Sequence, residues 1–151
     1  MRAVADALID SNVVVALVAE DHEHHEASLA FFLAGASRRL AVAAHSYAEA
    51  FATLTRHSGG GAFRWQPGDA WRALEAVAAA TVLIGLSAAQ TLDTVRSYAE
   101  AGGVGARLYD RLIGQTAVQH GIARIVTWNV GHMRDLFPNL EVCNPAVATR
   151  A

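Results

Sequence analysis

The feature that most constrains this fold is the alternation of short apolar segments with longer segments of helical spacing. The apolar runs are typical of buried strands and lie at 8–9, 40–43, 81–86 and 124–127, with a last edge strand at 140–142. Helical patterns stand between them, after Asp10 and at 24–34, 46–57, 67–80, 87–102 and 108–120. Strands that alternate with helices predict an α/β fold of three layers, α/β/α, around a central and mainly parallel sheet.

Size and composition indicate one domain over residues 1–151. A chain of 151 residues, of which 53% are hydrophobic, buries one good core and is too short for two. The longest apolar stretch, Ala76 to Leu86, falls short of the roughly 20 residues that cross a bilayer, so we expect no membrane association and a cytoplasmic protein. Cys143 is the single cysteine, which excludes an intramolecular disulfide and a cysteine-based zinc site.

Acidic and amide side chains follow several of the predicted strands. Asp10, Glu49 and Asn129 each come after one, and the carboxyl ends of parallel strands meet at one edge of a sheet. Asp110 reaches the same edge if the helices before it turn back toward the sheet. Carboxylate oxygens are the ligands that Mg²⁺ and Mn²⁺ prefer, and such a metal activates water for attack on a phosphodiester. A cluster of acids without a cation would be costly.

Each acid also has a purely structural interpretation, and sequence position alone leaves the alternatives open. Asp10 is equally suited to cap the helix that begins at Ser11. Ser46 and Glu49 have the spacing of a capping box, which favours a structural role for Glu49. Asp110 lies in the first turn of a helix, where the macrodipole favours negative charge.

The order and surroundings of four segments resemble the motifs of PIN domains. These segments are Leu8-Ile9-Asp10-Ser11-Asn12-Val13, Ser46-Tyr47-Ala48-Glu49 running to Arg56, Tyr109-Asp110-Arg111-Leu112-Ile113, and Ile125-Val126-Thr127-Trp128-Asn129. The resemblance spans about Ala5 to Val142 and is strongest to the VapC toxins of bacterial type II toxin-antitoxin pairs, a family of metal-dependent endoribonucleases. Together the four segments are specific, whereas each alone is weak.

The resemblance implies a site and a set of partners. Asp10, Glu49 and Asp110 would be ligands of Mg²⁺ or Mn²⁺, and Thr127 and Asn129 would complete a catalytic pocket. It further implies an RNA substrate, a homodimer and a cognate antitoxin protein that blocks the site.

One departure from the family pattern leaves a second function open. Many relatives carry Asp where this chain has Asn129, which adds no negative charge and puts a second metal in doubt. The alternative is therefore a PIN-like scaffold that binds RNA or protein and cuts weakly or not at all. Asp135 lies near enough in sequence to compensate, although a surface or helix-end role is favoured.

Remaining features carry weaker hypotheses. His22, His24 and His25 suggest zinc, but neighbouring residues diverge by about 100° on a helix and no further ligand stands at a standard spacing. A phosphate-accepting receiver domain is also an α/β fold with acids at the strand ends. It is disfavoured because such domains share a lysine, and this chain has none.

Aromatic and basic residues near the acids suggest contacts with RNA. Trp128 and Arg134 are candidates to stack on or pair with RNA, and Trp128 is equally suited to be a partly buried core residue. Arg107 and Arg111 flank Asp110, where they either bind phosphate or offset the charge of the acid.

Overall fold

The computed structural model describes residues 3–35 and 38–150 and has one five-stranded sheet in the order β3-β2-β1-β4-β5, with every pair parallel. The strands are β1 (Ala7–Ile9), β2 (Leu40–Ala43), β3 (Val82–Ile84), β4 (Arg124–Val126) and β5 (Glu141–Cys143). The helices are α1 (Ser11–Val18), α2 (His25–Ala34), α3 (Ala44–Thr55), α4 (Pro67–Ala80), α5 (Ala88–Glu100), α6 (Arg107–Gln119), α7 (Val130–Leu136) and α8 (Pro145–Arg150). The predicted α/β class and parallel sheet are confirmed.

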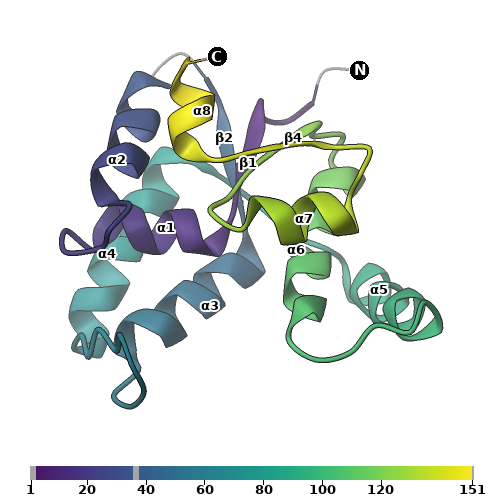
Figure 1. Cartoon of the computed structure of the whole chain (residues 1–151), viewed down its shortest axis with the longest axis horizontal. Helices are drawn as coiled ribbons and strands as arrows, with labels where there is room; N and C mark the ends of the chain where they lie inside the picture. The colour runs from purple at the N-terminus through teal and green to yellow at the C-terminus, as the bar shows by residue number, and fades with distance from the viewer. Residues whose placement is uncertain (1–2, 36–37, 151) are drawn as a thin grey trace.

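The sheet separates two hydrophobic cores, because side chains of a strand alternate between its faces. Ile9, Val42 and Val126 point into the core shared with α1 to α4. Leu8 and Ile125 point into the other core, which α6 and α7 close. Helices therefore cover both faces of the sheet, and α5 packs outside α6 (Figure 1). The predicted three layers are present.

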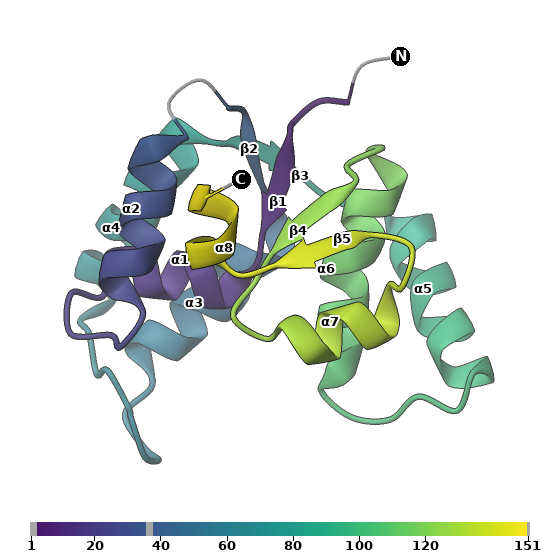
Figure 2. The same cartoon turned by 45° about the horizontal axis from the view of Figure 1, so that its top comes forward.

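The middle strands are almost wholly apolar because both of their faces are covered. All residues of β1 and β2 are buried. At the edge strand β3, by contrast, the Leu83 side chain is 62% exposed, and the strand is shorter than the predicted 81–86. The C-terminal strand β5 forms the opposite edge as predicted, and the chain then turns back to place α8 against α2 (Figure 2).

Two parts of the sequence-based assignment need correction. Helix α3 begins at Ala44, directly after β2, and ends at Thr55, so the predicted start at Ser46 is wrong. Helices α7 and α8 were not expected; both are short, with seven and six residues. The predicted cap at Ser87 is confirmed, since its hydroxyl accepts from the Gln90 N–H at 3.1 Å and Gln90 bonds back to the Ser87 N–H.

The strand order creates a switch point between β1 and β4. From β1 the chain proceeds through β2 to β3 on one side, whereas β4 and β5 lie on the other side. In open α/β sheets, ligands bind outside the carboxyl ends of the strands at such a point. Here the strands end at Ile9 and Val126, which are register partners. Within the described ranges, no helix is long and apolar enough to cross a membrane.

Candidate active site

Asp10 follows β1 at the switch point, and its carboxyl group is almost wholly buried, with 1% of the residue exposed. One oxygen, Oδ1, accepts from the Ser11 N–H at 2.7 Å, and Oδ2 accepts from the Thr127 hydroxyl at 2.8 Å. The helix-cap interpretation of Asp10 is thus correct. Burial nonetheless raises the pKa of Asp10 to about 6, against the lowering effect of Thr127, and the Asp110 charge raises it further.

Thr127 organises the polar groups around Asp10. It follows β4, is fully buried and lies 117 residues from its partner. Besides donating to Asp10, its hydroxyl oxygen accepts from Asn12 Nδ2 at 3.1 Å and from the Asn129 backbone N–H at 3.0 Å. The Asn12 side chain then accepts from the Trp128 backbone N–H at 3.0 Å, which ties α1 to the end of β4. Thr127 therefore fixes the orientation of the Asp10 carboxylate.

Glu49 lies in the second turn of α3, so the capping-box interpretation is wrong. Ser46 is buried inside that helix and caps nothing. Burial raises the pKa of Glu49 to about 7, and the charges of Asp10 and Asp110 raise it further. One carboxyl oxygen, Oε1, is buried without a hydrogen bond among the described residues.

His45 does not satisfy this orphaned oxygen. Its Nε2 lies 3.2 Å from Glu49 Oε1, but the contact lacks hydrogen-bond geometry. Burial also lowers the pKa of His45 while that of Glu49 is raised, so the two do not form a charged pair at neutral pH. The Glu49 carboxyl group is left with an unmet demand for a donor or a cation.

Asp110 lies in the first turn of α6, as predicted, and is half-buried. Burial raises its pKa, and the nearby charges of His132 and Arg107 oppose that rise. Arg107 Nη2 lies 2.9 Å from His132 Nε2. Of the two alternatives for Arg107, the structure supports charge compensation of Asp110. Arg111 instead lies over the Phe137 ring, 5.0 Å from its centroid. His132, on α7, was missed because that helix was not predicted.

Asn129 is linked to Asp10 by its backbone N–H, through the Thr127 hydroxyl, and not by its side chain. Its N–H donates to Thr127, while its side chain is exposed and makes no hydrogen bond within the described part of the chain. Asp135 is exposed near the end of α7, which agrees with a surface or helix-end role. Whether Asn129 takes part in chemistry remains a prediction.

The donor set suits a hard divalent cation. The charge of Asp110 raises the pKa of Asp10, and both charges raise that of Glu49, so a cation among them would relieve a repulsion. The free Glu49 oxygen offers a ligand. Within residues 3–35 and 38–150, no three His, Cys, Asp or Glu side chains are close enough together to form a complete metal cage. Mg²⁺ needs no such cage, because it keeps several waters and takes one or two carboxylates from the protein.

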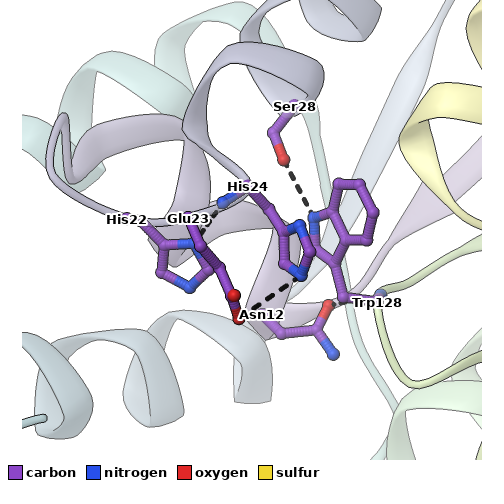
Figure 3. Close-up of polar contacts among 6 residues, drawn as sticks. All are labelled: Asn12, His22, Glu23, His24, Ser28 and Trp128. Carbon is purple, nitrogen blue, oxygen red and sulfur yellow. Dashed lines mark hydrogen bonds and ion pairs between the residues drawn. The ribbon is translucent and has the colours of Figure 1, made fainter.

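Trp128 is held by the protein on several sides (Figure 3). Its Nε1 donates to the buried Ser28 hydroxyl at 2.9 Å, and the His24 ring stacks on it with centroids 3.8 Å apart and planes 9° from parallel. Arg134 donates to the Val142 carbonyl at 3.1 Å. These contacts favour the core alternative for Trp128, and Arg134 is bonded to the backbone of β5.

The third histidine of the sequence cluster points elsewhere. His25 Nδ1 lies 2.8 Å from the Ala16 carbonyl oxygen, to which the ring can donate a hydrogen bond.

A comparison with known protein families shows which family the chain is related to. The family model described as the PIN domain matches residues 7–131, which include Asp10, Glu49, Asp110 and Asn129. The chain belongs to the PIN domain family. No curated protein sequence matches it.

Solved structures share this PIN fold at low sequence identity. VapC20 of Mycobacterium tuberculosis, described as a sarcin-ricin loop cleaving toxin, is 12% identical with a TM-score of 0.65, over 85% of this chain and 94% of that one. VapBC2 of Rickettsia felis, solved on a promoter DNA fragment, is 16% identical with a TM-score of 0.66, over 91% and 97%. VapBC-1 of nontypeable Haemophilus influenzae is 16% identical with a TM-score of 0.60, over 92% and 97%.

Proposed function

We propose that this PIN domain is an endoribonuclease that uses Mg²⁺ or Mn²⁺ to hydrolyse RNA phosphodiester bonds. The observation that supports the proposal is the electrostatic interaction of three acids, in which the charge of Asp110 reaches Asp10 and both of these charges reach Glu49. Burial raises all three pKa values, and repulsion from neighbouring acids raises those of Asp10 and Glu49 further. A protein gains no stability from such an arrangement, so a ligand that needs it is the natural explanation.

The residues divide into ligands and positioning groups. Asp10 and Glu49 would hold the cation with carboxyl oxygens, among them the unpartnered Oε1 of Glu49, and Asp110 would complete the set. Thr127 fixes the Asp10 carboxylate by its hydrogen bond, and the charges of Arg107 and His132 oppose the rise in the pKa of Asp110. When bound, the divalent cation supplies the positive charge that activates water and balances the charge of the phosphate. Asn129 would contribute a neutral amide at the rim.

A scaffold that binds RNA or protein without cutting is the second candidate. It is favoured by the neutral, exposed Asn129 side chain and by the lack of a complete cage among the described residues. Both candidates use the same surface, and only the chemistry separates them.

Cleavage of RNA with added Mg²⁺ or Mn²⁺, compared with EDTA, tests the activity. We expect cleavage with either metal and none with chelator, and loss of cleavage in Asp10→Asn, Glu49→Gln and Asp110→Asn. Asp135→Asn is the matched control, since this acid is exposed, and it should cut at the parental rate. Activity that persists in excess EDTA would exclude the metal mechanism, and inactivity with every metal would favour the scaffold.

We further propose that the chain is the toxin of a type II toxin-antitoxin pair and acts in the cytoplasm as a homodimer. Support comes from the fold, which it shares with a structure described as a toxin and with VapBC structures. Expression of the chain alone should arrest bacterial growth, and co-expression of the protein encoded beside it should restore growth. Harmless expression of a protein that cuts RNA well would reject the toxin assignment and leave the nuclease intact.

A further inference from the structure

A small pocket lies directly beside the acidic site. Its volume is about 170 Å³, several times the roughly 30 Å³ that one water occupies in the liquid. It is lined by Ser11, Asn12 and Val15 of α1, Thr53 of α3, His22 and Phe63. The first two residues directly follow Asp10, and Asn12 Nδ2 lies 3.5 Å from Asp10 Oδ2. A group bound in this pocket would therefore be a close neighbour of a phosphate bound at the acids.

Two aromatic rings form part of the wall. His22, in the loop between α1 and α2, and Phe63, in the loop between α3 and α4, are stacked with planes 4° from parallel and centroids 6.2 Å apart. Phe63 packs against the core, which holds it in place. Burial and the neighbouring His24 lower the pKa of His22, so its ring is neutral at neutral pH. Flat, neutral rings of this kind stack on nucleobases of any sequence.

The pocket also offers hydrogen-bonding groups that have no partner among the residues described. His22 Nδ1 accepts from the His24 backbone N–H at 3.0 Å, so the proton of the neutral ring is on Nε2, which points away from His24 (Figure 3). Neither this Nε2 nor the Thr53 hydroxyl has a hydrogen bond to another described residue. Asn12 differs, because both ends of its amide are already bonded.

The neighbouring Trp128 is not a free stacking platform. His24 covers one face of its indole ring and itself lies 3.5 Å from the Glu23 carboxylate through Nε2. These contacts hold residues 22–24 together at the start of α2 and so fix the position of His22 (Figure 3). His22 and Phe63, by contrast, both line an open pocket.

We propose that this pocket binds one nucleobase of the RNA strand, stacked on the His22 and Phe63 rings and read by the His22 Nε2–H and the Thr53 hydroxyl. The inference rests on the proposed function, since it assumes that the ligand at the acids is RNA. An N–H donor favours a base that presents a ring nitrogen or a carbonyl oxygen. Phe63 would then supply affinity for every base, and Thr53 and His22 would supply preference.

Binding of fluorescent RNA hexamers of A, C or U, measured by anisotropy in EDTA at low salt, tests the pocket without any need for cleavage. Phe63→Leu keeps an apolar side chain and should weaken binding of all three hexamers by about 5- to 150-fold, the range measured for loss of one stacked base. Phe63→Tyr keeps the ring and should restore the affinity. Thr53→Val keeps the shape and should change the order of preference among the hexamers. Trp71→Leu, at an exposed aromatic residue of α4 outside the pocket, should change neither.

The outcomes separate the pocket from the nuclease activity. Parental affinity and preference in Phe63→Leu and Thr53→Val, with normal melting curves, would overturn the pocket even if the protein cuts RNA. Failure of the unmodified protein to bind any hexamer would overturn it as well. Binding that follows the expected pattern in a protein that never cuts would support the pocket and reject the nuclease.

Discussion

Replacing Asp10 with Asn should stabilise the metal-free protein at neutral pH. Burial raises the pKa of Asp10 from 3.8 to about 6, so the folded state binds a proton more tightly than the unfolded state. For such an acid, the free energy of unfolding falls as the pH rises from 3.8 toward 6 and then levels off. The full penalty for holding the ionised carboxylate is about 3 kcal/mol.

The expected gain is smaller than this penalty. The introduced amide would keep an oxygen for the Ser11 N–H, but its NH2 group would replace the oxygen that accepts from the Thr127 hydroxyl, so that hydrogen bond would be lost at a cost of about 1 kcal/mol. We therefore expect Asp10→Asn to raise the free energy of unfolding by about 2 kcal/mol at about pH 7.5, which is roughly 4–8 °C in melting temperature for a domain of this size. At about pH 4.5 the penalty shrinks to about 1 kcal/mol and the advantage should vanish.

Urea unfolding in EDTA at both pH values measures this difference. Asp135→Asn is the control, because an exposed acid should change stability by less than about 0.5 kcal/mol. Added Mg²⁺ should stabilise the unmodified protein more than Asp10→Asn, since a ligand stabilises the state that binds it. An Asp10→Asn variant that is less stable than its parent by the same amount at both pH values would refute the reasoning and leave Asp10 as a cap alone.

Two further predictions concern the support of the site. Thr127→Val should lower the free energy of unfolding in urea by about 1–3 kcal/mol and reduce RNA cleavage, because it leaves the buried partners of the hydroxyl unpaired. The control Thr116→Val loses only a hydrogen bond to the Leu112 carbonyl within α6 and should lower it by less than half as much. Gly114→Ala should lower the stability of the protein by about 1–3 kcal/mol in thermal melts, because the added Cβ would lie 2.0 Å from the Phe137 ring and push α6 away from α7. In the control Gly131→Ala, on α7, the added Cβ meets nothing within 4 Å and should not destabilise the protein. Equal losses of stability in the two variants would contradict this explanation.

The middle of the sheet could be predicted because β1 and β2 are buried on both faces and are therefore apolar throughout. Ile9 and Val42 are such residues. Helix α7 could not, since its seven residues begin after Asn129 without a side-chain cap and its Met133 is the one buried residue of the helix. Short helices of this kind depend on tertiary packing more than on local sequence.

Asp10 and Glu49 were singled out by their positions after strands and Asp110 by the resemblance to PIN domains, but the surroundings of these acids could not be predicted. Ser46 and Glu49 matched a capping box by spacing, yet β2 runs into α3 at Ala44 without a loop, which places both residues inside the helix. His132 is 25 residues from Arg107, its partner beside Asp110, and only the fold brings the two together. The pairing of Asp10 with Thr127 likewise depends on strand order, which periodicity does not reveal.

The neighbouring positions of β1 and β4 also bear on synthesis of the chain. Asp10 emerges early from the ribosome, but its partner Thr127 follows 117 residues later. Until that segment has emerged and β4 has paired with β1, the carboxylate has no hydroxyl to orient it, and the long loop between the two strands must close first. The nascent chain therefore carries all three acids before it carries the hydroxyl group that orients Asp10.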